Sequence, residues 1–454
     1  MAERVLPGVS VEVKSEGLIT TTAGAPNVIG MVGTANWGPM ETVTTVGSFS
    51  EAVEIFGTDD TDLTMKKALE LAYNEGATTM RAVRIGDGNE AYATKTLLNG
   101  ATPVITLNGL YKGTYGNQIS VTVTSNATTP ANRDLNLTDG SLVETYINKA
   151  TNTDIASAIN ANSSLCSAIV VAPTPITDVM SVANLIGGDD GESVTNADYI
   201  GGISLFESED INILVCAGQS DDALHASMNT HCQQMAEVGR ERIAIGGSAL
   251  GEDITTIKAR ITKSDRFVFL CPGVDVVDTQ TGATVTRAGA YTASGFAGML
   301  AKYDVQTSLT NKQIVSVSGV ENAYTDANLK DLLNDERCPV RKKTTIKIAR
   351  GITTSTDSAW KQITTRRIVD YVSDGVRTAG DNFIGRLNNT RVRSALKGVV
   401  DSFLNDLVTN EVLIGFSAEV SATRSDEIAG VCKVNLQIQP VFSIDFIEVV
   451  IYLQ

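Results

Sequence analysis

The feature that most constrains this chain is the apolar run formed by its last fourteen residues, 441–454. In an extended conformation this run places apolar side chains on both faces, and such a strand needs cover on both sides. Val9, Val11 and Val13, near the other end, alternate with polar residues behind a Pro-Gly turn signal. Two interpretations stay open for these segments, namely pairing within their own domain or donation as strands to neighbouring copies.

The composition sets the class of protein. With 454 residues the chain has room for about three ordinary domains, and 43% hydrophobic with 19% charged residues allows several buried cores. A net charge of −16 argues against nucleic-acid binding, so no direct nucleic-acid partner is expected. No run approaches the ~18 apolar residues of a membrane helix, so no stable membrane insertion is expected either.

Cysteine usage and the first residues bear on the compartment. The six cysteines are scattered without a C-x-x-C pattern, which favours folding in a reducing compartment. Residues 1–20 contain no basic segment followed by an apolar one, so no secretion signal is expected.

Charge is distributed unevenly along the chain. Residues 86–210 contain fourteen acidic and four basic residues, a net of −10, whereas residues 341–397 contain thirteen basic and four acidic residues, a net of +9. One part is therefore acidic and another basic, which makes charge complementarity between surfaces a plausible element of function.

Hydrophobic periodicity predicts a mixed α/β, multidomain fold with an inserted mainly-β domain and extended strand arms at both ends. Strand-like and helical segments alternate on both sides of a region dense in Thr, Ser, Asn and Gly. The expected domains are an N-terminal arm at 1–20, an α/β core at 21–86 and 199–340, the β insertion at 87–198, a basic C-terminal α/β domain at 341–440, and a C-terminal arm at 441–454.

The C-terminal domain has the clearest helical pattern. Apolar residues repeat at i, i+3, i+4 and i+7 over 392–408, and a basic helix is expected before it at 359–376. Strands are expected at 412–420 and 431–438.

No set of residues predicts catalysis, a cofactor or a metal site. His225 and His231 lie on one expected helix, and their spacing with Cys232 does not bring all three to one face. The turn around Ser248 follows a strand, but Leu250 stands where a nucleophile elbow needs its second glycine. There is no P-loop, although the glycine turn leaves a weak option for binding a phosphate.

Several segments, in chain order, resemble the sheath proteins of contractile phage tails and related contractile injection systems. They are the Pro-Gly-Val arm at 6–12, the strand and glycine turn at 28–39, the Ser-x-x-Glu helix ending in Phe-Gly at 48–57, the Gly-x-x-Gly-Asn signature at 113–117, the strand at 210–215, Trp360 with Thr365–Arg367, and the helix at 392–408.

This resemblance implies a structural, non-enzymatic subunit without cofactors. Six-fold rings would stack into a helical sheath around an inner tube and contract to drive the tube through a target envelope, as in genome ejection by a phage. The implied partners are further copies of the chain, the inner tube, and baseplate and tail-terminator proteins. The implied location is a virion tail assembled in the host cytoplasm, or an extracellular contractile particle.

Two sets of residues are expected to make the assembly contacts. The expected arm positions are Val5, Val9, Val11, Val13, Ile444, Phe446, Glu448, Val450 and Tyr452. The expected inner-tube contacts are drawn from Arg366, Arg367, Arg377, Arg386, Arg391, Arg393 and Lys397.

Two other functions stay open at this point. A non-contractile surface or appendage protein that assembles by strand exchange would share the arms. A cytoplasmic α/β enzyme would instead use the glycine turn at Gly246 for a phosphorylated ligand.

Overall fold

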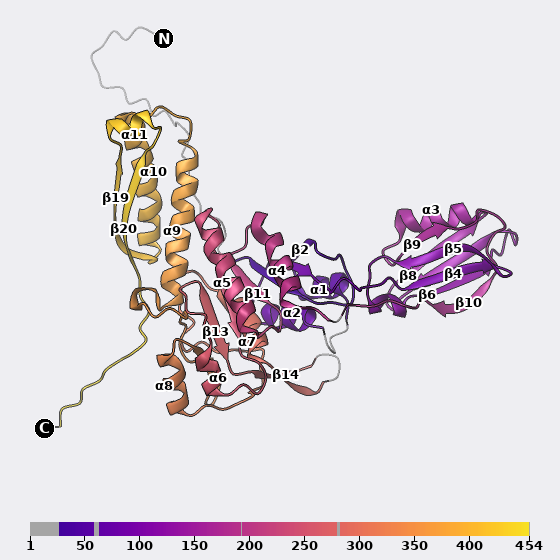
Figure 1. Cartoon of the computed structure of the whole chain (residues 1–454), viewed down its shortest axis with the longest axis horizontal. Helices are drawn as coiled ribbons and strands as arrows, with labels where there is room; N and C mark the ends of the chain where they lie inside the picture. The colour runs from indigo at the N-terminus through magenta and orange to yellow at the C-terminus, as the bar shows by residue number, and fades with distance from the viewer. Residues whose placement is uncertain (1–26, 59–62, 192, 279–281, 454) are drawn as a thin grey trace, which may run out of the picture. The chain divides into compact units, whose positions relative to one another are not determined.

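A computed structural model describes residues 27–58, 63–191, 193–278 and 282–453. Contacts divide the chain into two compact units. The core unit consists of the described residues up to Asp370 together with 442–453, and the C-terminal unit consists of residues 371–441. Figure 1 shows the elements of both units.

The core unit is built on an eight-stranded sheet. Its six central strands are parallel, and one antiparallel strand lies at each edge. In spatial order the strands are β18 (Ile346–Ile348), β17 (Cys338–Lys342), β13 (Phe267–Cys271), β12 (Ile243–Gly247), β11 (Ile213–Cys216), β1 (Ile29–Gly33), β3 (Met80–Arg84) and β2 (Val43–Val46). Strands buried on both faces read as continuous apolar runs, so the predicted α/β fold class is confirmed.

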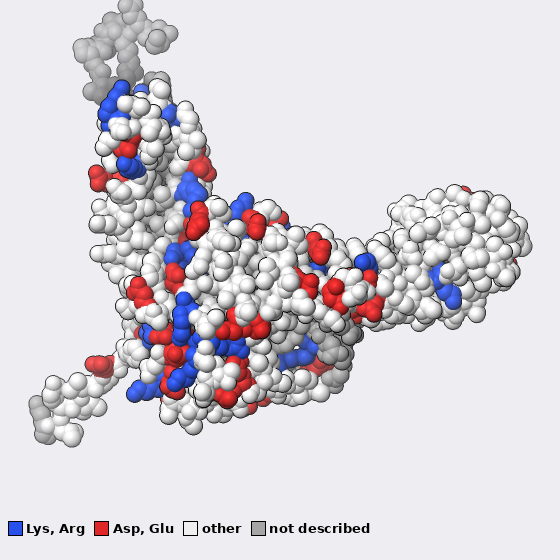
Figure 2. Space-filling model, viewed as in Figure 1, with Lys and Arg blue, Asp and Glu red and all other residues white. Residues whose placement is uncertain are grey.

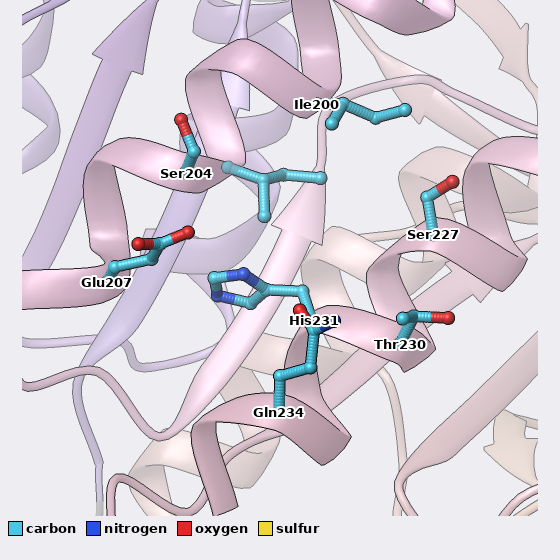
Figure 3. Close-up of a pocket in the computed structure, with 8 residues that line it drawn as sticks. Ile200, Ser204, Glu207, Ser227, Thr230, His231 and Gln234 are labelled. Carbon is cyan, nitrogen blue, oxygen red and sulfur yellow. The ribbon is translucent and has the colours of Figure 1, made fainter. Parts of the chain in front are cut away.

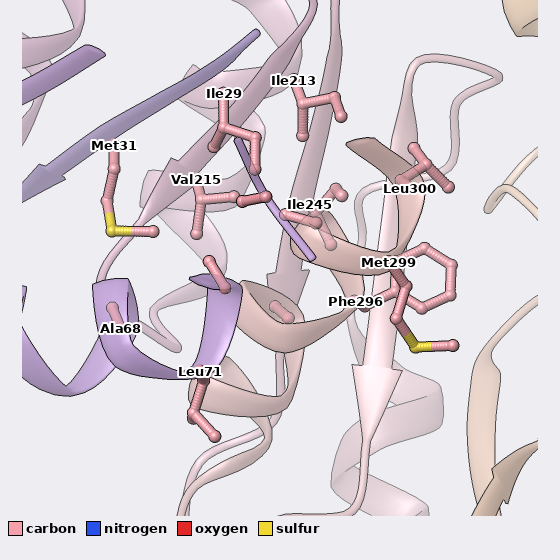
Figure 4. Packing of buried hydrophobic residues seen from close by; sticks show 14 of the residues in the cluster. Ile29, Met31, Ala68, Leu71, Ile213, Val215, Ile245, Phe296, Met299 and Leu300 are labelled. Carbon is pink, nitrogen blue, oxygen red and sulfur yellow. The ribbon is translucent and has the colours of Figure 1, made fainter. Parts of the chain in front are cut away.

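Helices cover the two faces of this sheet. Alternate side chains of β11 enter different cores, since Ile213 and Val215 pack with one set of helices while Leu214 and Cys216 pack with another. Helices α2 and α7 lie on the first face (Figure 4), and α4 and α5 contribute to the second core. The helices are α1 (Phe49–Phe56), α2 (Met65–Asn74), α4 (Asn196–Ser204), 3-10 helix η2 (Leu205–Ser208), α5 (Asp222–Glu237), α6 (Ile254–Ala259), α7 (Gly289–Lys302) and α8 (Asp326–Asn334).

A three-stranded antiparallel sheet completes this part of the core unit. Its strands are β15 (Thr284–Arg287), β14 (Val274–Val277) and β16 (Gly319–Val320).

The segment between β3 and β11 forms two further antiparallel sheets with a hydrophobic core of their own. One sheet has the order β10 (Met180–Asn184), β6 (Ser120–Ser125), β7 (Arg133–Thr138), β8 (Val143–Lys149), and the other has the order β4 (Thr94–Asn99), β5 (Thr102–Gly109), β9 (Cys166–Val170). The 3-10 helix η1 (Thr114–Gln118) and helix α3 (Asn152–Asn162) accompany them. This is the mainly-β insertion that the composition predicted.

The two ends of the insertion meet. Ala91 and Asp189 exchange backbone hydrogen bonds, as do Thr94 and Ile186. Beside this junction the fully buried guanidinium of Arg84 donates to the carbonyl oxygen of Lys112 at 2.7 Å and lies 3.7 Å from the Asp190 carboxylate. Burial lowers the pKa of Arg84 to about 10, partly offset by the acidic neighbours.

The C-terminal unit contains two long helices and a two-stranded sheet. Helix α9 (Ile363–Asp381) begins in the core unit, after the 3-10 helix η3 (Ser358–Trp360), and ends in the C-terminal unit. It is followed along the chain by α10 (Thr390–Thr409), β19 (Leu413–Ser421), α11 (Arg424–Ile428) and β20 (Lys433–Pro440). The predicted apolar stripe of α10 is buried at Leu396, Val400, Phe403, Leu404 and Leu407. The helix and strand predictions for this region are confirmed.

The two compact units divide at Asp370. Strand β17 pairs in parallel with β13 and so extends the core sheet. The expected domain bounds, including the C-terminal domain at 341–440, stay predictions.

Close packing of α7 on α2 depends on a glycine. A Cβ atom on Gly298 would overlap the main-chain carbonyl of Ala72, and a backbone atom cannot rotate away. One turn earlier, a Cβ on Gly295 would make only ordinary contacts, the nearest at 3.7 Å from Glu75.

We therefore expect Gly298→Ala to destabilise the core unit by about 1–3 kcal/mol through overpacking. Gly295→Ala in the same helix is the matched control and should be neutral or stabilising by up to about 1 kcal/mol, because alanine favours helix. Denaturant unfolding of both variants measures the difference. Equal stabilities would contradict the proposed helix contact.

His225 belongs to the second core rather than to a site. Its ring is buried against Phe267 and Phe269, and its Nε2 lies 3.2 Å from the carbonyl oxygen of Gln219. Burial, aided by the positive charge of Arg260, lowers the pKa of His225 to about 4.

This shift predicts a pH-dependent stability. Between the unfolded pKa of about 6.5 and the folded value of about 4, the unfolded chain binds more protons, so stability falls as the pH falls through that window. His225 alone contributes up to about 3 kcal/mol of this loss. Urea unfolding at pH 7.5 and pH 5 should show a smaller loss for His225→Gln than for the unsubstituted chain. An identical loss of stability in both proteins would show that groups other than His225 cause the pH dependence.

Candidate functional site

The C-terminal tail, residues 441–453, has an inverted burial pattern. Ser443 and Asp445 face the protein, whereas Phe442, Ile444 and Phe446 face outward. Among the described residues the tail forms neither strand nor helix, and Figure 1 shows it running to the end of the chain as a plain trace. A segment that buries polar groups and exposes apolar ones is incomplete by itself.

Asp445 fixes the start of this tail to the core unit. Its carboxylate accepts from Arg350 Nε at 2.7 Å, from Gln362 Nε2 at 3.2 Å and from the hydroxyl of Thr310 at 3.2 Å. The Asp445 side chain is 6% exposed. We call Thr310, Arg350, Gln362, Ser443 and Asp445 the Asp445 clamp.

Gln362 also binds the tail backbone. Its Oε1 accepts from the amide of Ser443 at 3.2 Å, and its Nε2 lies 3.4 Å from the Ser443 carbonyl oxygen. The guanidinium of Arg350 lies 5.2 Å from the ring centre of Phe446. The clamp therefore holds residues 443–446 through both side chain and backbone.

Beyond the clamp the tail is exposed. Ile444, Phe446, Val450 and Tyr452 are each more than two-thirds exposed, and Glu448 is exposed as well. These are the arm positions expected from the sequence, and their pairing stays a prediction. The N-terminal arm positions Val5, Val9, Val11 and Val13 lie outside the described residues.

The C-terminal unit has a two-stranded sheet with unused edges. Strands β19 and β20 pair with each other and, within the described part of the chain, with no other strand. Val434, Leu436 and Ile438 of β20 are half-buried, while the residues between them are exposed. Each outer edge thus presents backbone donors and acceptors on an amphipathic sheet.

Arg366 and Arg367 are turned into the protein. Arg366 forms ion pairs with Asp265 at 2.9 Å and Asp370 at 2.6 Å and lies 4.5 Å over the Trp360 ring. Arg367 is buried and lies 3.1 Å from the side-chain oxygen of Asn27, and burial lowers its pKa to about 10. In this conformation neither residue offers its charge to a partner, because both are buried among internal acceptors.

The remaining expected tube contacts differ in how free they are. Arg393 pairs with Glu427 and Lys397 with Asp401, and Arg377 lies 3.9 Å from Asp374. Arg386 and Arg391 are exposed, and in the described chain neither forms an ion pair.

Sequence reasoning missed a second set of unpaired cations. Arg341, Lys342, Lys343 and Lys347 lie on the β17–β18 hairpin and, over the described ranges, take part in no ion pair. By contrast, Figure 2 shows blue and red side chains interleaved around α6 and α8, where Lys258 pairs with Asp331. A run of four cations in seven residues was the available signal.

The two glycines expected to form a phosphate-binding turn are the last residues of β12, and there is no room for a phosphate beside them. A Cβ on Gly247 would already overlap the main chain of Gly289, and the amide of Ala290 donates to the carbonyl oxygen of Ser248. Ser248 is itself buried. The start of α7 fills the space that the enzyme interpretation needs.

A hollow of about 280 Å³ lies between α4 with η2 and α5 (Figure 3). It is lined by Ile200, Ile203, Ser204, Glu207, Ser227, Thr230, His231 and Gln234. The Nε2 of His231 lies 3.0 Å from Arg242 Nη1, and burial together with that charge lowers the pKa of His231 to about 4. The lone pair that a catalytic base needs is therefore already engaged.

Two features are absent from the described residues. Among them, no group of three or more His, Cys, Asp or Glu side chains is placed to hold a metal ion. None of the helices within those ranges is long and apolar enough to cross a membrane.

Three family models match the chain in order. The Gp18 domain III N-terminal region of tail sheath protein matches residues 28–85, the phage tail sheath protein central domain matches 192–354, and the phage tail sheath C-terminal domain matches 355–454. No curated protein matches the chain.

Solved structures share the fold along nearly the whole chain. A sheath tail protein from Desulfitobacterium hafniense is 18% identical with a TM-score of 0.72, and the match covers 96% of this chain and 100% of that one. A sheath tail protein from Listeria innocua is 17% identical with a TM-score of 0.72, over 93% and 94% of the two chains. The helical sheath of the anti-feeding prophage, in its contracted state, is 14% identical with a TM-score of 0.61 over 99% of each.

The family models match in chain order over residues 28–85 and 192–454, the solved sheath structures share the fold, and the chain belongs to the contractile tail sheath family.

Proposed function

We propose that this chain is the structural subunit of a contractile sheath in which donated β-strands link neighbouring copies. Six-fold rings of the chain stack around an inner tube, as part of a phage tail or an extracellular contractile particle. Contraction drives the tube through a target envelope. Baseplate and tail-terminator proteins bind the two ends of the sheath, and the subunit itself performs no catalysis.

The observation that carries this proposal is the exposed apolar tail. Residues 446–453 place almost only apolar side chains in solvent, which costs free energy until a partner covers them. Strand addition to a sheet edge satisfies the tail backbone and covers its side chains in one step.

The open edges of β19 and β20 are the proposed acceptors. An incoming strand at either edge would extend the sheet and gain main-chain hydrogen bonds that need no particular side chain. In this proposal residues 1–20 and 441–454 act as arms, residues 87–198 face outward, and the C-terminal domain faces the tube. Linked arms keep the subunits connected while the rings move.

The tube contacts are proposed to come from exposed cations of the C-terminal domain. Arg386 and Arg391 are the leading positions, because internal carboxylates do not neutralise them. Exposed pairs of ~0.2–1 kcal/mol each would be numerous enough to guide assembly and weak enough to break on contraction.

Strand donation predicts a specific loss of assembly. Val450→Glu places a charge on the tail face that a neighbour should cover, so the concentration needed for tube formation should rise tenfold or more. Val182→Glu is the matched control, since Val182 is 66% exposed and Val450 71% exposed. Negative-stain electron microscopy of tubes over a concentration series measures both.

Deletion of residues 1–14 or of residues 446–454 should abolish the tubes altogether. Monodisperse particles from the full chain, or tubes from either truncated chain, would sink the proposal and reopen the non-contractile and enzymatic alternatives.

The tube contact is tested by charge reversal. Arg386→Glu with Arg391→Glu should reduce co-sedimentation of the sheath with the tube protein of the same particle, most strongly at low salt. Lys330→Glu, at an exposed position of α8, is the control and should leave it unchanged. Co-sedimentation that is insensitive to both salt and reversal would remove these residues from the interface.

A further inference from the structure

We propose that the Asp445 clamp directs the C-terminal tail toward a second copy of this chain by preventing it from pairing with its own β20. This inference rests on the proposed strand donation and adds the residues that decide between the two pairings. Asp445 acts as a positioning residue. Its own contacts are within one chain, but they determine whether the tail pairs with a second chain.

The tail has two candidate acceptors of the same chemistry. Its own β20 ends at Pro440, immediately before the tail, and the outer edge of β20 is open. A neighbouring copy offers the same edge. The local edge has the advantage of proximity, since a hairpin connection needs only about two to five residues. A chain that relied on apolar burial alone would therefore favour self-pairing.

The clamp opposes self-pairing of the tail with β20. To pair with β20, the chain would have to reverse its direction in a turn directly after Pro440, at residues 441–445. In the structure the segment from Val441 to Leu453 contains no turn or bend, and alternate side chains at 441–446 point to opposite sides. Such a segment advances by roughly 3.3 Å per residue, so Asp445 lies on the order of 16 Å along the chain from Pro440.

The clamp contacts are suited to setting the direction of the tail rather than to burying its apolar side chains. They are polar and engage the side of the tail that carries Ser443 and Asp445, and they leave Ile444 and Phe446 outward. The apolar face thus remains available to a partner while the start of the tail is fixed.

The clamp also limits the reach of the tail. Residues 446–453 follow it, and their fully extended length is roughly 26 Å. If residues 446–453 are the segment that pairs, the acceptor edge of the second copy must begin within that distance of Arg350. Loss of the clamp would add the residues from Val441 onward to the free segment and relax the constraint.

The test compares Asp445→Asn with Asp210→Asn. Both remove an aspartate paired with an arginine, but the Asp210–Arg240 pair lies outside the tail and Asp210 is 94% exposed. Hydrogen exchange of the unassembled proteins is measured at residues 446–453 and at β20. In the unsubstituted chain and in Asp210→Asn we expect unprotected tails. In Asp445→Asn we expect exchange of the tail and of β20 to slow at least tenfold, with the tube-forming concentration raised to a similar extent.

Gln362→Ala provides a second variant that retains the Asp445–Arg350 ion pair, and it should shift both measurements in the same direction by a smaller factor. Thermal unfolding of each variant shows whether it still folds. An unfolded variant would not show slower hydrogen exchange in the tail or in β20. An Asp445→Asn protein with an unprotected tail and an unchanged tube-forming concentration would overturn the inference. Failure of the unsubstituted chain to form tubes would instead refute the proposed function, while the exchange comparison would still decide the role of the clamp.

Discussion

Extended backbone needs hydrogen-bond partners on both sides. The segments of this molecule differ in how many of these partners they find within their own chain. The six parallel strands of the core sheet provide partners for one another, and backbone groups of residues 311–314 bond to β18 at its edge. Among the described residues, β19 and β20 pair as strands only with each other, and the tail joins no strand, although its backbone is hydrogen-bonded at Val441 and Ser443. An α/β core of paired strands therefore supports a part whose strand edges stay unpaired within the described residues.

The charged side chains of the described residues divide in the same way, into those paired within the chain and those left exposed without a charged partner. At the start of α9, Arg266 and Arg366 share the carboxylate of Asp370 in a nearly buried network. Burying such charges is costly unless each is paired and hydrogen-bonded, so the network defines one arrangement rather than adding much stability. Lys342 and Lys343 on the β17–β18 hairpin, and Arg386 and Arg391, stay exposed, so their charge reaches solvent.

Local patterns account for the part of the structure that the sequence predicted. The stripe on α10 and the apolar runs of β11 and β13 need only neighbouring residues to be recognised, because periodicity reports burial directly. Charge counts misled where partners lie far apart in sequence. Arg366 pairs with Asp265, 101 residues away, and Arg350, Lys361 and Arg393 likewise pair with carboxylates distant in sequence. The clamp was not predicted, since a single aspartate in an apolar tail carries no periodic signal.

The junction of the β insertion has a consequence for how such proteins diversify. The insertion has its own core, and its two ends meet at the Ala91–Asp189 and Thr94–Ile186 bridges. A domain attached through adjacent backbone positions can be shortened, replaced or deleted while the strands that flank it keep their places, because a short linker spans the same gap. The insertion is thus a structurally separable module, and this junction is a natural point for grafting a foreign domain.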